Sequence, residues 1–229
     1  MGWFHFKGKD SRDFGILISA APEKVKALSS VEHDTHPGRN GELTVDEGTY
    51  APYVISVECG TRGSENLDEI LAWLNGAGDL ILCTEPDKVL RASIYNKISV
   101  ADMIYLYNSF LLQFRVQPFK YSVNAAGDAL ELTAPTTIRN SGTVYSEPII
   151  TVYGSGNITL SINGNSYPLR NVDESITIDS EMMEVFKGNT NQNGKYGGAE
   201  FPRFEVGKNE ISWTGNVSKI KIQPRWRWL

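Results

Sequence analysis

Short runs of alternating apolar and polar residues constrain this chain more than any other feature. Six of them follow one another at nearly even spacing in the second half, at residues 149–153, 157–162, 166–169, 175–179, 209–213 and 218–223. Alternation of this kind is typical of strands that bury one face. Asn163-Gly164 stands between two of the runs and is a strong signal for a two-residue hairpin turn. We therefore expect an antiparallel β-sandwich in this half.

Strand-like runs also fill most of the first half. Residues 4–6 and 14–18 flank turn residues at 8–11, which predicts an opening hairpin. Further runs lie at residues 80–83, 89–95 and 105–116. Residues 33–46 read HDTHPGRNGELTVD, and this density of glycine, proline and polar residues predicts a long loop. Long loops in compact domains commonly carry function.

Helical periodicity is confined to one segment, residues 66–75. Apolar side chains recur there at the spacing of one helix face, at Leu67, Ile70, Leu71 and Leu74. Asn66 and Glu69 have the spacing of a capping box, and Gly76 is a residue that commonly ends a helix. The first half is therefore predicted to be a β-sandwich-like domain with one packed α-helix and a long loop.

The length of 229 residues suits two domains of ordinary size. A hydrophobic content of 41% and a charged content of 21% are those of a globular protein with a sizeable core. Small and polar residues replace the aromatic run between Val123 and Pro135. We place the boundary there, which gives domains at residues 1–130 and 131–229, both mainly β.

Charge and cysteine content limit the classes of partner. A net charge of −5 and a pI near 5.3 argue against binding to a phosphate backbone, which needs clustered lysine and arginine. The N-terminus lacks the basic start and apolar stretch of a secretory signal, and no apolar run approaches the length that spans a membrane. Cys59 and Cys83 are far apart, and we expect two reduced thiols in a protein made in a cytosol.

A search for catalytic or metal-binding residues finds two weak candidates. His33, Asp34 and His36 lie close together, but a structural zinc site needs four ligands, so a solvated loop is the favoured interpretation. The carboxylates of Asp179, Glu181 and Glu184 could act as a pair in sugar hydrolysis, yet a solvated face is favoured for them too. No nucleophile motif is present. The sequence predicts no enzyme, no cofactor and no metal.

Aromatic residues keep a binding function open, because five tryptophans and ten tyrosines could stack against sugar rings. Near the C-terminus, Pro224 should end the last strand, after which Trp226 and Trp228 alternate with arginines. Exposed tryptophans would present a large apolar surface. We expect Trp226 and Trp228 to be buried at the junction between the domains or against a partner.

Three segments of the chain resemble the distal tail (Dit) proteins of long-tailed bacteriophages. The first is FHFKGKDSRDFGILI, at residues 4–18. The second is PGRNGELTVDEGTY, at residues 37–50, followed by LDEILAWLNGAGDLIL at residues 67–82. The third comprises ITIDSEMMEVF, FPRFEVGKNEISWTG and the closing IKIQPRWRWL. Their order and spacing cover most of the chain.

The resemblance implies a virion protein at the distal end of the tail of a phage with a Gram-positive host, made in the host cytoplasm. It implies a homo-hexameric ring, formed by the N-terminal domain, that joins the tail tube protein to the tail-associated lysin or central fibre. The C-terminal domain would be a galectin-like β-sandwich that holds adsorption or receptor-binding components. The chain is similar to the short form, without an inserted carbohydrate-binding module. The acidic balance fits a ring through which DNA passes without specific binding.

Within this frame, the long loop is the expected contact between subunits, because a loop rich in glycine and proline has no role inside a compact core. The residues assigned to this interface are Pro37, Gly38, Arg39, Gly41 and Leu43. The alternative function is a monomeric carbohydrate-binding β-sandwich module. A sizing measurement separates a ring of six subunits from a monomer that binds glycans.

Overall fold

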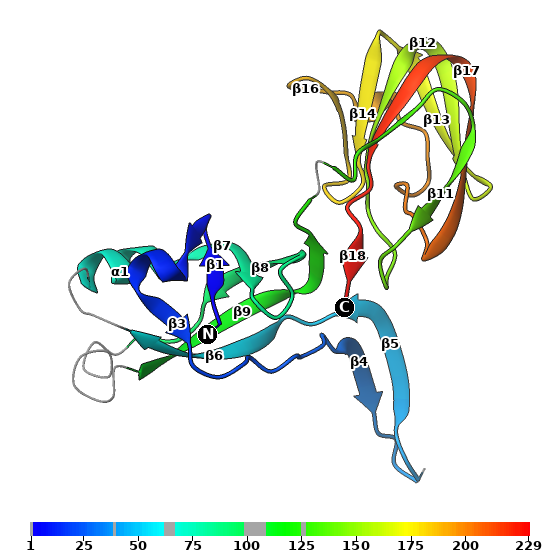
Figure 1. Cartoon of the computed structure of the whole chain (residues 1–229). Helices are drawn as coiled ribbons and strands as arrows, with labels where there is room; N and C mark the ends of the chain where they lie inside the picture. The colour runs from blue at the N-terminus through cyan, green and yellow to red at the C-terminus, as the bar shows by residue number, and fades with distance from the viewer. Residues whose placement is uncertain (1, 39, 62–66, 99–108, 125–126) are drawn as a thin grey trace. The chain divides into compact units, whose positions relative to one another are not determined.

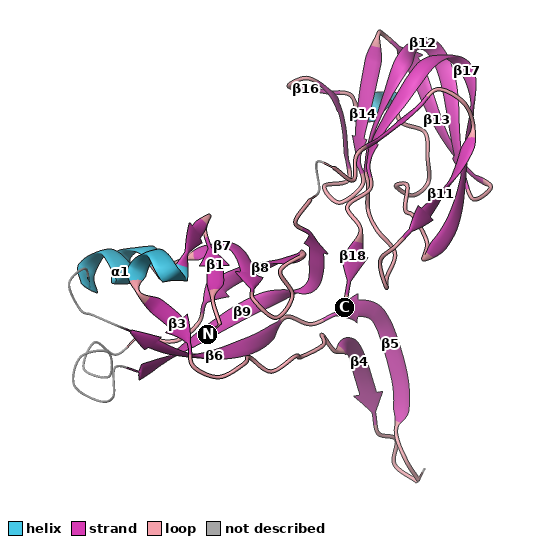
Figure 2. Ribbon diagram, in the orientation of Figure 1, coloured by secondary structure: helices cyan, strands magenta, loops and turns pink. Residues whose placement is uncertain are grey.

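The structure is a computed structural model that describes residues 2–38, 40–61, 67–98, 109–124 and 127–229. It divides into two compact units, Met1–Val123 and Asn124–Trp228, called here the N-terminal and C-terminal units (Figure 1). The division lies inside the shift of composition at residues 123–135, and before residue 130. Strands make up most of both units, and the only α-helix among the described residues is in the first (Figure 2). The mainly-β fold is thus confirmed.

The N-terminal unit is built on one antiparallel sheet that curls onto itself. Its strand order is β2-β1-β7-β8-β9-β6-β3. Gly2 pairs with Ile18 of the last strand, so the chain just before β1 meets the opposite edge of the sheet. The strands are β1 (Phe4–Phe6), β2 (Lys9–Asp10), β3 (Ile16–Ile18), β6 (Tyr53–Thr61), β7 (Ala77–Leu82), β8 (Lys88–Ile94) and β9 (Ser109–Ser122).

The opening hairpin differs from the prediction in its second strand. β1 pairs with β2, not with the run at residues 14–18, and Lys7 and Gly8 form the turn with positive φ of 51° and 75°. A 3-10 turn, η1 (Ser11–Phe14), then reverses the chain and ends at Gly15, whose φ is 67°. β3 consequently pairs with β6. Of the residues 8–11 predicted as the turn, only Gly8 lies in it, because Lys9 and Asp10 form the returning strand β2 and Ser11 begins η1.

The predicted helix is present as α1 (Leu67–Trp73). Ile70 and Leu74 are buried as expected, and Gly76 follows the helix with a φ of 71°. Trp73, which the periodicity did not select, is also buried, because its ring stacks on those of Phe4 and Phe14. Its indole Nε1 donates a hydrogen bond of 2.8 Å to the carbonyl oxygen of Phe6. The proposed cap Asn66 lies outside the described residues. No described helix is long and apolar enough to cross a membrane.

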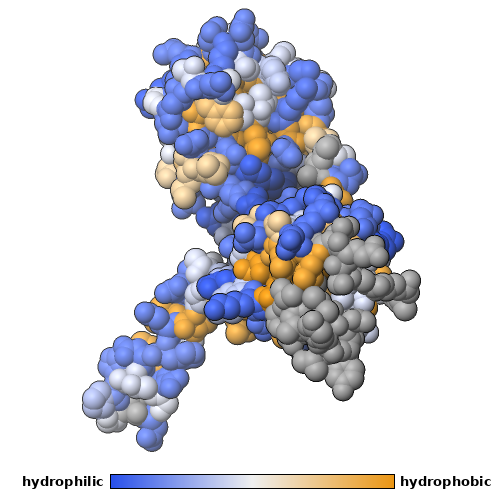
Figure 3. Space-filling view, turned by 90° about the vertical axis from the view of Figure 1, so that its left-hand side faces the viewer, coloured by the Kyte–Doolittle hydropathy of each residue, from blue (hydrophilic) through white to orange (hydrophobic). Residues whose placement is uncertain are grey.

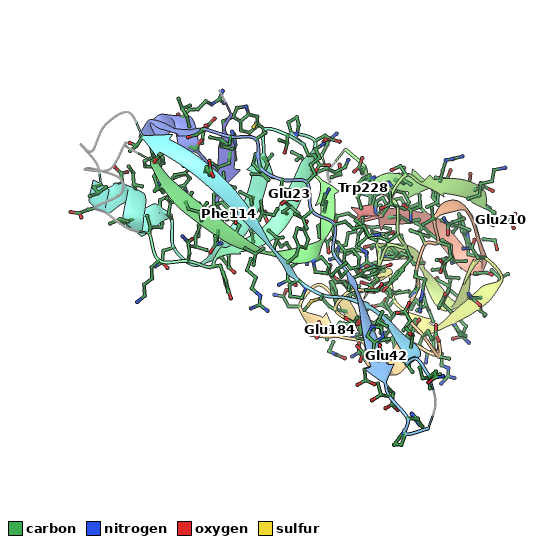
Figure 4. All side chains as sticks on the ribbon, turned by 90° about the horizontal axis from the view of Figure 1, so that it is seen from below. Glu23, Glu42, Phe114, Glu184, Glu210 and Trp228 are labelled. Carbon is green, nitrogen blue, oxygen red and sulfur yellow. The ribbon has the colours of Figure 1, made fainter. Side chains whose placement is uncertain are left out.

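The inner face of the sheet and the helix enclose the core of the N-terminal unit. Phe4 and Phe6 pack edge-on against Phe114, which Figure 4 labels, with ring centroids 5.8 and 5.5 Å apart. Residues 105–108, which were predicted to begin the last strand of this half, lie outside the described residues. The alternation along β9 places Phe110, Leu112, Phe114 and Val116 in the core.

The segment predicted as a long loop is largely a β-hairpin. β4 (Ser29–Asp34) and β5 (Leu43–Tyr50) form a separate two-stranded antiparallel sheet in which His33 faces Thr44 and Asp34 faces Leu43. Between the two strands, the described residues 35–38 and 40–42 belong to neither strand. The prediction of irregular structure over residues 33–46 was therefore wrong at both ends, because residues 33–34 and 43–46 are in strands. The many polar residues of this segment made the apolar–polar alternation that begins at Leu43 difficult to recognise.

The C-terminal unit is an antiparallel sandwich with strand order β10-β17-β12-β14-β15-β16, to which β11 adds on β17 and β13 on β12. Its buried residues form a core of their own that includes Ile150, Leu160, Phe204 and Ile220. The elements are β10 (Leu130–Leu132), β11 (Thr136–Asn140), β12 (Ile149–Ile162), β13 (Asn165–Val172), β14 (Ser175–Asp179), β15 (Glu184–Lys187), β16 (Thr190–Asn191), η2 (Asn193–Lys195), β17 (Gly207–Gln223) and β18 (Arg227–Trp228).

Two pairs of the predicted runs are single long strands. Residues 149–153 and 157–162 belong to β12, and residues 209–213 and 218–223 belong to β17. The small polar residues between the runs form irregularities in the pairing of these two strands, not turns. The hairpin at Asn163-Gly164 is confirmed, with φ of 51° and 83°.

Candidate functional site

The histidines proposed as possible metal ligands face carboxylates on the β4–β5 hairpin. His33 Nδ1 lies 3.3 Å from Glu42 Oε2, and His36 Nδ1 lies 3.7 Å from Asp34 Oδ2. All four side chains are more than half exposed. Over the part of the chain that the structure describes, no three histidine, cysteine or acidic side chains gather in a way that could hold a metal.

The acidic candidate Asp179 is a buried structural residue, which corrects the expectation of a solvated face. Its two carboxylate oxygens accept hydrogen bonds of 2.7 and 2.9 Å from the guanidinium of Arg225. Burial alone would raise the pKa of Asp179, but the bonds from Arg225 and from two backbone N–H groups outweigh it and lower that pKa. Glu181 lies 3.2 Å from the same guanidinium, and Glu184 is exposed.

The C-terminal tail packs into the core of its own unit. β17 ends at Gln223, as Pro224 predicts, and Trp226 then turns back against Phe204 with ring centroids 5.8 Å apart. Trp228 is half-buried against the same core. The role assigned to these two tryptophans between the domains stays a prediction.

The arginines of the tail are not a solvated face either. The side chain of Arg227 is only 5% exposed. It donates hydrogen bonds of 2.9 Å to the Tyr145 carbonyl oxygen and to Glu147 Oε2, and its guanidinium lies 4.5 Å from the Tyr145 ring centroid. Through these contacts, Arg227 holds the end of the chain against residues 145–147, which precede β12.

Both cysteines are free thiols. Cys59 is buried in β6, and burial raises the pKa of its thiol to about 12. A thiol with such a pKa stays protonated near neutral pH and is a poor nucleophile.

A groove of about 570 Å³ crosses β10, β17 and β12 on the outer face of the sandwich, and Glu131, Lys221 and Thr151 contribute to its lining. Lys219 and Lys221 both form ion pairs with Glu131, at 3.2 and 3.7 Å. The same two ammonium groups lie 5.4 and 5.9 Å from the Tyr153 ring centroid. A sugar ring that stacked on Tyr153 would have to displace them.

The residues assigned to the subunit interface gather at the end of the β4–β5 hairpin. Pro37, Gly38 and Gly41 are exposed in its connecting loop, and Leu43 begins β5 with 44% of its surface exposed. Figure 4 labels the neighbouring Glu42 near this end. Arg39 lies outside the described residues. The four described residues of the predicted set are therefore brought together in space, on a hairpin that the sequence analysis did not foresee.

One face of this hairpin combines apolar and acidic side chains. Leu43 stands opposite Asp34 and Val45 opposite Glu32, and directly opposed residues of an antiparallel pair share a face. Val45 is 48% exposed, and apolar patches are visible on the hairpin in Figure 3. We call Leu43, Val45, Glu32 and Asp34 the hairpin face. The sequence analysis did not assign Val45, Glu32 or Asp34 to the interface, although the alternation from residue 43 to residue 46 was a usable signal.

Most of the net charge of the chain resides in the hairpin. Residues 29–50 contain five acidic side chains and one basic one, a net charge of −4 out of −5 for the whole chain. An isolated two-stranded hairpin is at best marginally stable in water. At the base of the hairpin, the ring of Tyr50 packs edge-on against the ring of Phe119, with ring centroids 5.5 Å apart. A hairpin with these properties gains stability by docking on another surface.

No family model matches the sequence, and no curated protein matches it. Solved structures do match, among them the Dit protein (gp 19.1) of SPP1, described as a paradigm of the hub adsorption apparatus in phages that infect Gram-positive bacteria. The TM-score is 0.73, the sequence identity is 12%, and the match covers 97% of this chain and 98% of that one. Both units, and their order along the chain, are therefore similar to Dit in fold.

Proposed function

We propose that this protein is a structural component of the distal end of a phage tail, a hub protein of the Dit type in its short form. The observation that carries the proposal is the match with SPP1 Dit over nearly the full length of both chains. A match confined to one β-sandwich would fit many functions, because sandwiches serve unrelated roles. A match that covers 97% of this chain extends over both units and is more specific.

The function that follows is assembly rather than catalysis. Six copies form a ring through their N-terminal units, and the ring joins the tail tube protein to the tail-associated lysin or central fibre. The C-terminal units hold adsorption or receptor-binding components. The protein is made in the host cytoplasm, and DNA passes through the ring without specific binding.

The β4–β5 hairpin is the proposed contact between subunits. Two observations support it: the exposed apolar side chains of Leu43 and Val45, and the concentration of charge on the hairpin. A ring needs two different complementary patches on each subunit, and a projecting hairpin supplies one of them.

The mass of the purified protein tests the proposal. Light scattering coupled to size exclusion is expected to give six subunits, and electron microscopy is expected to show rings. Replacing residues 32–45 by a two-residue Asn-Gly turn, or changing Leu43→Ser with Val45→Ser, is expected to yield monomers. Met182→Ser with Met183→Ser is the matched control, because it removes two apolar side chains that are 64% and 66% exposed in the C-terminal unit.

The alternative function, a monomeric carbohydrate-binding module, is favoured by the groove beside Tyr153. It predicts a wild-type monomer that binds a glycan and loses this binding on Tyr153→Ala. A monomer with that behaviour would replace the ring proposal. A ring that forms unchanged without the hairpin would leave the ring proposal standing and show that the hairpin is not the contact between subunits.

A further inference from the structure

We propose that the hairpin face docks on the outer sheet face of the N-terminal unit of a second copy, in the hollow between Arg91 and Arg115. This inference rests on the proposed ring and names the surface that receives the hairpin. It follows from the complementary charge and the exposed apolar side chains of two surfaces of the same chain.

The receiving surface is a hollow of about 320 Å³ over β7, β8 and β9. Arg91 and Arg115 stand on either side of Ser93, and both are exposed. Their guanidinium groups lie 4.6 Å from the Tyr121 ring centroid and 6.0 Å from the Tyr95 ring centroid. Arginines held over aromatic rings present their charge in a limited set of positions.

The surroundings of the hollow are basic and partly apolar. Lys7 adds a third positive charge at its border, where its side chain lies across Gly78 and its ammonium donates to the Asn75 carbonyl oxygen at 2.6 Å. Asp79 is the carboxylate that lines the hollow, opposite Arg91. Among the described residues, no carboxylate pairs with Arg115.

Exposed apolar side chains continue this surface along the sheet. Val54 stands opposite Arg115 in the register of β6 and β9 and is 37% exposed. Leu111 points to the same side of β9 as Arg115 and is 43% exposed. The surface therefore offers apolar contacts together with a local excess of positive charge.

The hairpin face has the complementary composition. Its carboxylates Glu32 and Asp34 can approach the two arginines while Leu43 and Val45 cover the apolar part. Outside residues 29–50, the N-terminal unit contains equal numbers of acidic and basic residues, so this attraction is local to the two surfaces. Complementary charge fixes orientation and suppresses wrong pairings, which a ring with one defined geometry requires.

Charge reversal tests the pairing in the full-length protein. Arg91→Glu with Arg115→Glu is expected to lower the assembled fraction about tenfold or more, as is Glu32→Lys with Asp34→Lys. The four changes together are expected to restore assembly. Glu42→Lys with Asp46→Lys alters the same charge off the hairpin face, and it is expected to retain the ring.

Cross-linking supplies a second measurement that does not need a stable ring. Leu43→Cys with Ser93→Cys, treated with a short bifunctional maleimide, is expected to give a ladder of covalent oligomers. Thr44→Cys with Ser93→Cys places the first thiol on the opposite face of the hairpin, and Leu43→Cys alone controls for the native thiols. Neither control is expected to give the ladder.

Failure of this inference is distinguishable from failure of the ring proposal. If the shortened hairpin abolishes the ring but reversal of Arg91 and Arg115 leaves it unchanged, the hairpin docks elsewhere and only the receiving surface is wrong. If the combined reversal does not recover assembly, or the Leu43→Cys and Ser93→Cys pair gives no ladder, the inference is likewise overturned. If the shortened hairpin still assembles, the hairpin is not the contact, and this inference fails while the ring proposal stands. If the wild-type protein is a monomer, the proposed function itself fails.

Discussion

At the scale of single residues, the contact between Arg225 and Asp179 shows how a group that suggests chemistry can serve structure. The side chain of Asp179 is 9% exposed and that of Arg225 is 19% exposed. The positive φ of Arg225, 51°, belongs to the turn that directs its guanidinium back to the end of β14. The last residues are thus joined to the sandwich by a paired charge.

Asp179→Asn is expected to destabilise the C-terminal unit by about 2–3 kcal/mol. The change removes the carboxylate of a largely buried ion pair, so that the Arg225 guanidinium keeps only Glu181 as a charged partner. The folded-state pKa of Asp179 is lowered, so its contribution is present above the ordinary value of 3.8 and is lost as the pH falls below it. Urea unfolding at pH 7 and at pH 3 measures both effects, and the difference between wild type and variant should shrink at pH 3.

Glu184→Gln is the control for that experiment, because Glu184 faces Asp179 across β14 and β15 but is exposed. It is expected to change stability by about 0.5 kcal/mol or less. A hydrolytic activity that Asp179→Asn removes without a change in stability would contradict the structural role.

At the scale of elements, the irregular part of the pairing between β12 and β17 depends on two glycines. A Cβ atom on Gly154 would lie 2.2 Å from the carbonyl oxygen of Asn216, and one on Gly215 would lie 2.5 Å from that of Asn157. Gly215 also has a φ of 101°. These backbones approach too closely for any side chain, so the irregular pairing of the two strands requires glycine at both positions.

Gly154→Ala is expected to destabilise the C-terminal unit by about 2 kcal/mol or more, because the new methyl group meets backbone that cannot move without breaking the strand pairing. Gly194→Ala is the matched control, since a Cβ there meets nothing within 4 Å and its φ is not in the left-handed region. Thermal unfolding followed by circular dichroism compares the two. Equal melting temperatures would show that the pairing of β12 and β17 tolerates a side chain at Gly154.

At the scale of the whole molecule, each unit buries a core whose members come only from that unit. Two separate cores predict two parts that fold independently. Residues 124–229 expressed alone are expected to be a folded monomer, and residues 1–123 alone are expected to assemble like the full chain. Size exclusion and circular dichroism measure both. Assembly by residues 124–229, or its loss in a folded 1–123 fragment, would contradict the assignment of the ring to the N-terminal unit.

The sequence by itself determined the elements whose signals are local. The turn at Asn163-Gly164, the helix that ends before Gly76 and the strand at residues 175–179 all depend on neighbours within a few residues, so their patterns were readable. The interface residues from Pro37 to Leu43 were selected for a local reason too, namely a composition that excludes them from a core.

Only the tertiary structure decided which segments meet. The run at residues 14–18 pairs with β6, more than forty residues later, and no local pattern encodes that choice. Asp179 is buried because the guanidinium of Arg225 stands beside it, and a sequence shows a charge but not its partner. The β4–β5 hairpin is defined by pairs such as Asp34 with Leu43, which only the folded chain shows. The exposure of Leu43 and Val45 on one of its faces likewise follows from the structure alone. Long-range pairing and burial are properties of the folded chain, since they depend on contacts between residues that the sequence separates.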